Sequence, residues 1–275
     1  MGMSDVARIN ANTAPSPRIL PADPPAGPLA PATPVGFLGI VMLDTRFPRP
    51  PGDVGNPATF SVPTRQVIVK GAWPEKVVQT AVSMRANKLL APFSAMVRQL
   101  EQQGALAITT SCGFLVLLQR ELQAVVRVPV VTSSLLLLPE LLALQPQVGV
   151  LTISASRLEP EHLRCAGVPR QRLADVLLQG VDPGSEFARA ILGNLPQMDL
   201  QQAQADVLRA AQALKARAPH LSTLVLECTN MPPYAAAIEA HTGLHTVSLL
   251  QAQALFKPFQ QNAAAQAAAT VGLLP

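Results

Sequence analysis

The sequence has few of the residues that mark several common classes of protein. Only 14% of its 275 residues are charged, the formal net charge is +4, and the chain has one Trp and one Tyr. Lys and Arg form no run, so the chain offers neither a basic stripe nor an aromatic platform on which bases could stack. We therefore expect no nucleic-acid partner.

Long apolar runs are also missing. The longest ones, such as the run from Ser134 to Leu144, fall short of the ~20 residues that a membrane-spanning helix needs. The first residues lack the charged region and apolar core of a secretory signal. These two absences predict a cytoplasmic protein with no membrane partner.

Cysteine is scarce, with only Cys112, Cys165 and Cys228 in the chain. An odd number of cysteines in a long chain does not make a disulfide framework, so we expect reduced thiols. Cys165 is expected to be a small buried residue, as a lone cysteine usually is. His162 lies three residues before it, but no further ligand pair is evident, so the sequence predicts no metal site.

The composition changes sharply along the chain. Residues 1–34 hold eight of the 27 prolines, interleaved with Ala and small polar residues. Such a stretch cannot bury enough apolar surface to order itself, so we predict a disordered Pro/Ala-rich tail there. The whole chain is 49% hydrophobic, which is ample for a large core in the remaining residues.

From Gly36 onward, short apolar runs alternate with segments of helical periodicity. Runs typical of buried strands cover 36–43 (GFLGIVML), 65–71, 105–109, 128–132, 147–152, 174–179, 221–226 and 246–250. Helical segments are predicted at 74–103, 113–124, 134–144, 157–165, 200–217, 232–241 and 252–270. This alternation predicts an α/β protein whose parallel sheets are covered by helices.

Polar residues stand where several of these strands end, which is where α/β sheets bind ligands. Asp44 and Thr45 follow the first strand, TTSCG at 109–113 ends the strand at 105–109, and ECTN at 227–230 follows the strand at 221–226. Two of the three cysteines therefore occupy the same place in two strand–helix units. A thiol at a helix N-terminus is expected to have a lowered pKa, because the helix dipole favours the thiolate.

Two such thiols suit the inversion of a stereocentre next to a carboxylate. One group removes a proton from one face of the carbon, and the other returns a proton on the opposite face. Backbone N–H groups near Ser111, Thr229 and Asn230 would form an anion site that stabilises charge developing on the carboxylate.

The three motifs, Asp44–Thr45, TTSCG and ECTN, resemble those of the aspartate/glutamate racemase superfamily, which also includes hydantoin racemases, maleate isomerases and arylmalonate decarboxylases. The likeness runs from about Gly36 to the C-terminus. It implies two similar Rossmann-like lobes with parallel sheets around an interlobe cleft, and one catalytic cysteine in each lobe. Residues 36–130 plus 246–275 would form lobe one, and residues 131–245 lobe two.

The resemblance implies an isomerase, a cofactor-independent racemase or epimerase that acts on an amino acid or a related α-carboxylate compound. It implies no pyridoxal phosphate, no metal and a homodimer. Cys112 and Cys228 would be the catalytic residues of a two-base mechanism. The residues expected to bind the substrate are Asp44, Thr45, Thr110, Ser111, Gly113, Ser133, Thr229 and Asn230.

Two residues depart from the pattern of the family. Asn230 stands where glutamate racemases have His, which weakens the case for glutamate as the substrate. Glu227 stands where a small residue is more usual, and its carboxylate is expected to raise the thiol pKa by like-charge repulsion.

Other functions stay open. One alternative is a maleate-isomerase-like or arylmalonate-decarboxylase-like enzyme of the same superfamily, although such a decarboxylase has only one catalytic cysteine. Another is a non-catalytic small-molecule binding protein on the same scaffold.

Four residues also have two interpretations. Arg46 and Arg49, in the long loop 44–63, either bind a substrate carboxylate or are solvated loop charges. Ser133 and Thr152 either bond to the substrate or cap a helix.

Overall fold

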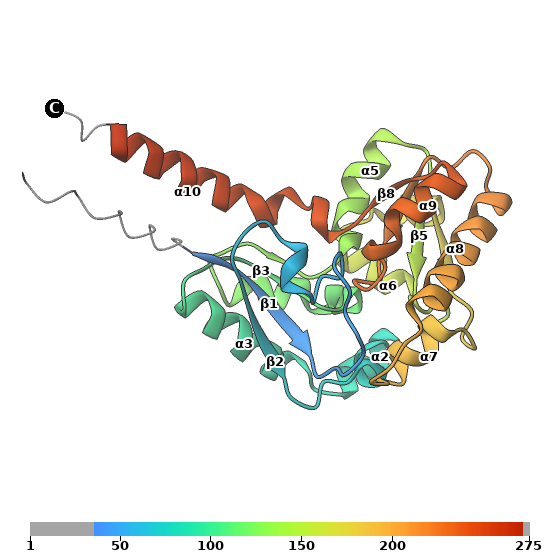
Figure 1. Ribbon diagram of the computed structural model, residues 1–275, viewed down its shortest axis with the longest axis horizontal. Coiled ribbons are helices and arrows are strands. Elements are labelled where there is room, and N and C mark those ends of the chain that lie inside the picture. Colours follow the sequence, from blue (N-terminus) through green and yellow to red (C-terminus); the bar gives the residue numbers. More distant parts are fainter. Residues whose placement is uncertain (1–35, 272–275) are drawn as a thin grey trace, which may run out of the picture. The chain divides into compact units, whose positions relative to one another are not determined.

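The structure is a computed structural model that describes residues 36–271, so the tail predicted at residues 1–34 lies outside the described residues. The described chain forms two four-stranded sheets in which all neighbouring strands are parallel (Figure 1). Helices connect the strands and cover the sheets. The predicted α/β class with two similar parallel-sheet lobes is therefore confirmed. None of the described helices is both long and apolar enough to cross a bilayer.

The first sheet has the strand order β2-β1-β3-β4. Its strands are β1 (Phe37–Leu43), β2 (Thr64–Val69), β3 (Ala105–Thr110) and β4 (Val130–Val131). All residues of β1 are buried, as a continuous apolar run predicts for a strand covered on both faces. Helix α3 (Leu90–Gln102) packs against one face, where Val41 and Phe93 share a core. The start of α10 (Gln253–Val271) covers the other face, where Leu255 packs with Leu38.

The second sheet has the order β6-β5-β7-β8, which repeats the order of the first. Its strands are β5 (Val148–Thr152), β6 (Val176–Gly180), β7 (Thr223–Leu226) and β8 (His245–Val247). The lobe boundary expected at residue 246 falls inside β8, and the residue bounds of the two lobes stay a prediction.

The remaining helices run between the strands. They are α1 (Pro74–Val77), α2 (Ala81–Ala86), α4 (Gln119–Ala124), α5 (Leu138–Leu144), α6 (Pro160–Cys165), α7 (Glu186–Leu192), α8 (Leu200–Arg217) and α9 (Ala235–Thr242). Short 3-10 helices are η1 (Pro57–Thr59), η2 (Gly113–Leu118), η3 (Ser134–Leu137), η4 (Arg170–Asp175), η5 (Pro232–Tyr234) and η6 (Leu249–Gln251). Helix α8 has its predicted bounds, and Asp199 caps its N-terminus by accepting from two backbone N–H groups. Helix α7 was not predicted.

The single helix predicted at 74–103 is wrong, because the structure divides this segment into α1, α2 and α3. Thr80 starts α2 as its N-cap, accepting from the backbone N–H of Ser83, and Lys88 ends the helical path with a φ of 51°. The break lets the segment reach α6, where the backbone N–H of Ala81 donates to Glu159 Oε2 over 2.9 Å.

In each sheet the strand order reverses between the two central strands, β1 and β3 in the first and β5 and β7 in the second. Loops that leave such a pair diverge, which opens a crevice at the carboxyl ends of the strands. Cys112 follows β3 and Cys228 follows β7, so each cysteine lies at one of these two crevices.

Candidate active site

The two cysteines occupy equivalent positions in the two sheets. Ser111, which precedes Cys112, donates its backbone N–H to a carbonyl of β1 over 3.0 Å. Glu227, which precedes Cys228, donates its backbone N–H to a carbonyl of β5 over 2.9 Å. Each bond continues the parallel ladder beyond the end of the strand. Each cysteine therefore begins the loop that leaves the carboxyl edge of its sheet.

Both thiols line the same cavity, and both cysteines are 7% exposed. Most of the wall is apolar, with contributions from Phe47, Val78 and Phe114. The cavity has a volume of about 20 Å³, which is room for about one water molecule. The cavity in this conformation therefore has no room for a molecule much larger than water.

Burial raises the pKa of both thiols, so the lowered pKa expected from helix N-termini is wrong. The pKa of Cys112 rises to about 12, first because the thiol is buried and then because the Glu227 carboxylate repels the thiolate. The pKa of Cys228 rises well above its ordinary value for the same two reasons. Cys112 precedes a short 3-10 helix and Cys228 precedes a turn, so neither feels a full α-helix dipole. The repulsion by Glu227 predicted from the sequence is confirmed.

Glu227 is a fully buried carboxyl group in the cavity wall. Its Oε2 accepts from Thr152 Oγ1 over 2.7 Å, whereas its Oε1 has no hydrogen-bond partner. Burial raises the pKa of Glu227 to about 7, although the bond from Thr152 favours the ionised form. Gly113 packs directly against this residue, and a Cβ at position 113 would collide with both Oε1 and the main-chain oxygen of Glu227. The close approach therefore requires glycine.

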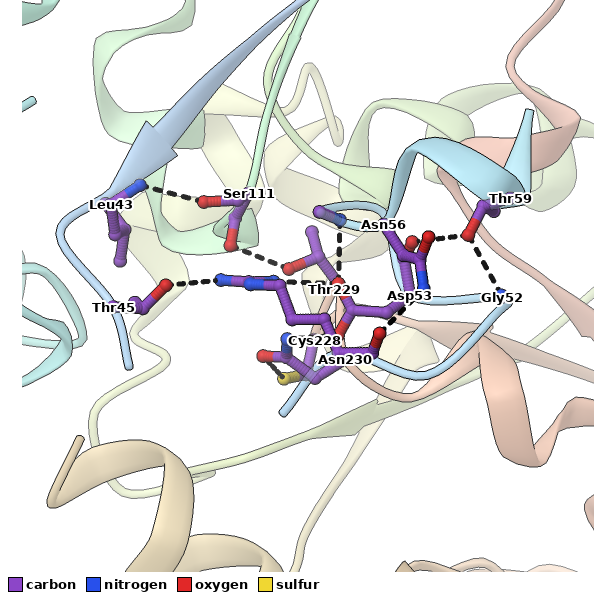
Figure 2. A network of polar contacts seen from close by, with 12 residues as sticks. Leu43, Thr45, Gly52, Asp53, Asn56, Thr59, Ser111, Cys228, Thr229 and Asn230 are labelled. Atoms are coloured by element: carbon purple, nitrogen blue, oxygen red, sulfur yellow. Dashed lines mark hydrogen bonds and ion pairs between the residues drawn. The ribbon is translucent and has the colours of Figure 1, made fainter. Parts of the chain in front are cut away.

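The loop between β1 and β2 reaches Cys228 through a chain of polar contacts (Figure 2). Cys228 Sγ lies 3.5 Å from Asn230 Oδ1, and Asn230 Nδ2 donates to Asp53 Oδ2 over 2.6 Å. Asp53 Oδ1 accepts from Arg49 Nη1 and from the backbone N–H of Gly55, each over 2.7 Å. The Arg49 charge is therefore paired with Asp53, and Arg49 is not the solvated loop charge of one interpretation.

The structure brings four of the predicted substrate-binding residues to the cavity wall. They are Ser111, Gly113, Thr229 and Asn230. Their side chains also hold the loops together: Thr229 Oγ1 donates to the Ser111 carbonyl over 2.7 Å, and Ser111 Oγ accepts from the backbone N–H of Leu43. Their part in binding a substrate stays a prediction.

The other four predicted residues, Asp44, Thr45, Thr110 and Ser133, lie outside the cavity lining. Asp44 accepts from the backbone N–H of Gly71, and Thr45 Oγ1 accepts from Arg49 Nη2. Thr110 Oγ1 donates to the carbonyls of Cys112 and Thr132, and Ser133 caps η3. All four therefore stabilise the loops near the site, and their contact with a substrate also stays a prediction.

Residues that the sequence analysis missed include Asp53 and the two aromatic residues of the wall, Phe47 and Phe114. Asp53 accepts from the backbone N–H two residues ahead, at Gly55, which is the hydrogen bond of an Asx turn. The sequence DVG carries that signal, because Asp followed by Gly in a loop favours such a turn. Arg46 is exposed, and its backbone N–H donates to Asn194 Oδ1.

Cys165 is exposed at the end of α6, so the expectation of a buried residue is wrong. The short helix α6 buries His162 and Leu163, which leaves Cys165 on its outer side. Within residues 36–271, no cluster of three or more His, Cys, Asp or Glu side chains is placed to hold a metal ion.

The sequence matches a family model described as Asp/Glu/Hydantoin racemase over residues 78–255. A dimethylsulfoniopropionate lyase of Durusdinium sp. clade D is 30% identical over 214 residues, which cover 75% of this chain and 69% of that protein. Dimethylsulfoniopropionate lyase 5 of Emiliania huxleyi (strain CCMP1516) is 29% identical over 214 residues, which cover 75% of this chain and 42% of the lyase. This chain therefore spans less than half the length of the second relative.

Among solved structures, the allantoin racemase of Pseudomonas fluorescens is similar with a TM-score of 0.47 and 18% identity. The superposition covers 77% of this chain and 85% of the racemase.

Proposed function

Since the chain belongs to the Asp/Glu/hydantoin racemase family, we propose that it removes a proton from the carbon next to a carboxylate. The proposed reaction is an elimination from dimethylsulfoniopropionate or a related sulfonium carboxylate. The observation that supports this proposal is the composition of the cavity wall. Two thiols and one carboxyl group lie in a largely apolar surface, and the described lining includes no Lys, Arg or His.

This wall suits a sulfonium ion better than an ammonium ion. A dimethylsulfonium group donates no N–H hydrogen bond, and its methyl groups can contact the apolar wall and the rings of Phe47 and Phe114. An ammonium group carries three N–H donors, each of which needs an acceptor when buried. Among the described lining side chains, only Glu227 has a fully buried oxygen without a partner. The relatives named as dimethylsulfoniopropionate lyases support the same substrate class.

In the proposed reaction, the Cys112 thiolate takes the proton from the carbon next to the carboxylate. The electrons of the C–H bond form a C=C bond, the C–S bond breaks, and its electron pair leaves on sulfur. The products are dimethyl sulfide and acrylate. We assign the base to Cys112 because backbone N–H groups of η2 and the charge of Arg49 lower its pKa in part, which offsets some of the effect of burial.

A racemase or epimerase of an amino acid or related carboxylate is the second candidate. The observation that favours it is that Cys112 and Cys228 line one cavity from equivalent strands of two sheets. Inversion uses an acid–base group on each face of the carbon, whereas elimination of a neutral leaving group uses a single base. In this second reaction the two cysteines would alternate as base and acid.

The two candidates are separated by assays of the purified protein. Dimethyl sulfide is measured by headspace gas chromatography and acrylate by NMR, with dimethylsulfoniopropionate as the substrate. Exchange of the α-proton is measured by NMR in heavy water over a panel of L- and D-amino acids and hydantoins. Release of dimethyl sulfide that is lost in C112S supports elimination. Exchange with inversion that is lost in both C112S and C228S supports racemisation instead. Thermal stabilisation by these compounds without turnover would contradict both and favour a binding protein.

A further inference from the structure

One polar atom of the cavity wall is unexplained by the fold. Glu227 Oε1 is buried without a hydrogen-bond partner, and it lies against the Cys112–Gly113 turn. The other oxygen of the same carboxyl group is bonded to Thr152 Oγ1. An ionised carboxylate that is buried without a cation is costly, so its position in the site calls for a function.

The titratable groups that face Glu227 are the two thiols. Cys112 reaches it from the end of β3, and Cys228 is its neighbour in sequence at the end of β7; the pKa of each thiol responds to its charge. From the end of β5, Thr152 contributes only a hydroxyl group. The charged and titratable groups around the thiols on their other sides are Arg49, Asp53 and Tyr234.

None of these outer groups neutralises Glu227. The guanidinium of Arg49 binds Asp53 Oδ1 over 2.7 Å and Thr45 Oγ1 over 3.1 Å. Asp53 is in turn bonded to Asn230. The cation of the site is thus already paired, and the proton of a neighbouring thiol is what could neutralise the Glu227 carboxylate.

We propose that Glu227 is the proton acceptor for the Cys112 thiol, and that the thiolate forms when the thiol proton moves across the shared cavity to the unpartnered Oε1. The inference rests on the proposed function, in which the Cys112 thiolate is the base that removes the substrate proton. Glu227 acts through Cys112 and is therefore a positioning residue for the proton, not a group that contacts the reacting carbon.

The proposed sequence of steps is balanced. The proton of the Sγ–H bond moves to Oε1, which leaves a thiolate and a neutral carboxylic acid. The thiolate then removes the substrate proton and becomes a thiol again, while dimethyl sulfide departs with the electrons of the C–S bond. After the products leave, the carboxylic acid of Glu227 gives its proton to solvent, which accounts for the proton released in the elimination.

The environment of Glu227 fits this role. A carboxylate of ordinary pKa is a poor acceptor for a thiol proton, because proton transfer is efficient when the two pKa values are close. Burial raises the pKa of Glu227 to about 7, which brings it nearer to the pKa of the thiol, while the ionised carboxylate still predominates above about pH 7.

The first test needs no substrate. Alkylation of Cys112 by iodoacetamide is followed by mass spectrometry of its peptide from about pH 6 to about pH 9. In the wild type, we expect the alkylation rate to rise with pH up to about pH 7, where Glu227 titrates. Above this pH the rate should flatten, because the ionised Glu227 carboxylate raises the pKa of the Cys112 thiol. In E227Q the rate should rise by about tenfold per pH unit throughout this range, without a bend. The exposed Cys165 is the internal reference and should behave alike in both proteins.

A second variant covers the case in which E227Q does not fold. T152V retains the glutamate but removes the hydrogen bond that favours its ionised form. The bend in the alkylation profile should therefore move to higher pH in T152V.

The second test measures turnover. E227Q should lose at least about tenfold in kcat/KM near neutral pH. The wild-type kcat/KM should rise with pH through about pH 7, where Glu227 titrates, and E227Q should lack this rise. A Glu227 that is only a neighbouring charge predicts the opposite, because its removal lowers the thiol pKa and speeds the reaction. A wild-type alkylation profile without a bend, or an E227Q variant at least as active as the wild type, overturns the inference. Because a merely neighbouring charge also bends the alkylation profile, the E227Q rate decides the inference, measured by dimethyl sulfide release or by α-proton exchange. A wild type that releases no dimethyl sulfide but whose α-proton exchange falls in E227Q supports the inference and contradicts the proposed function.

Discussion

Asn230 and Asp53 are 177 residues apart in the sequence and are joined by a hydrogen bond of 2.6 Å from Asn230 Nδ2 to Asp53 Oδ2. This contact ties the loop after β1 to the loop after β7, and therefore one sheet to the other. Two further bonds strengthen the junction: the backbone N–H of Val54 donates to the Thr229 carbonyl over 3.2 Å, and Thr229 Oγ1 donates to the Ser111 carbonyl over 2.7 Å. The relative position of the two thiols therefore depends both on the direct bond between their own loops and on the loop after β1, which contains neither of them.

The two cysteines should respond differently to replacement by serine if the reaction is an elimination. A serine hydroxyl is a far weaker acid than a thiol, so C112S removes the base and should lower kcat/KM for dimethyl sulfide release by about 10³-fold. C228S should retain a measurable fraction, because the leaving group departs neutral and needs no acid. The exposed Cys165 provides the control, and C165S should leave the rate unchanged. Equal losses in C112S and C228S would favour the two-base reaction.

Gly113 should not tolerate a methyl group. In G113A the new Cβ would collide with Oε1 and with the main-chain oxygen of Glu227, and overpacking of this kind costs about 1–3 kcal/mol of unfolding free energy. The shift of Glu227 should also lower activity. G184A is the matched control, because the nearest atom to a Cβ there is Asp182 Oδ1 at 3.4 Å. Urea denaturation of both variants measures the difference, and equal stability would contradict the contact between Gly113 and Glu227.

Much of the fold and the placement of the site could be predicted because the signals are local. The run GFLGIVML indicates a strand buried on both faces, and every residue of β1 is buried. The same logic places TTSCG and ECTN at the ends of strands, where the structure has them. The segment 74–103 does not form the single helix predicted for it, because its helical periodicity continues across breaks that depend on the cap at Thr80 and the positive φ of Lys88.

The electrostatics of the site could not be predicted from the sequence. The position of Cys112 before a helical turn suggested a lowered pKa, but the thiol is buried by segments that are distant in sequence, including Phe47 and Val78. Desolvation is a tertiary property and here exceeds the effect of nearby N–H groups. The Asn230–Asp53 bond likewise has no local signal, because no pattern in either loop specifies its partner.

Glu227 should make the protein less stable as the pH rises from about 4.5 to about 7. The pKa of Glu227 is raised from its ordinary value of 4.5 in the unfolded chain to about 7 in the folded protein, so between these values the folded state binds more protons. The free energy of unfolding then falls with increasing pH, by a total on the order of 3 kcal/mol for this group. E227Q removes the penalty, so it should gain stability over the wild type at pH ~8 and little at pH ~4.5. Urea denaturation at both pH values measures this. E75Q, at an exposed glutamate of α1, should stay within about 0.5 kcal/mol of the wild type at each pH.

Asp53 should be far more important for stability than an ordinary surface acid. Its ion pair with Arg49 spans 2.7 Å, and the two side chains are 1% and 10% exposed. In D53N the Arg49 charge loses its partner while it stays buried, which costs about 3–5 kcal/mol of unfolding free energy. The pair of Arg85 and Glu161 provides the control, because its side chains are 57% and 29% exposed, and R85A should cost no more than about 1 kcal/mol. Asparagine at position 53 also has one oxygen where aspartate uses two, so Arg49 and Asn230 cannot both keep an acceptor. Any activity that requires Cys228 should therefore fall in D53N even where the protein remains folded. A D53N variant as stable as R85A would contradict the buried pairing that joins the two loops.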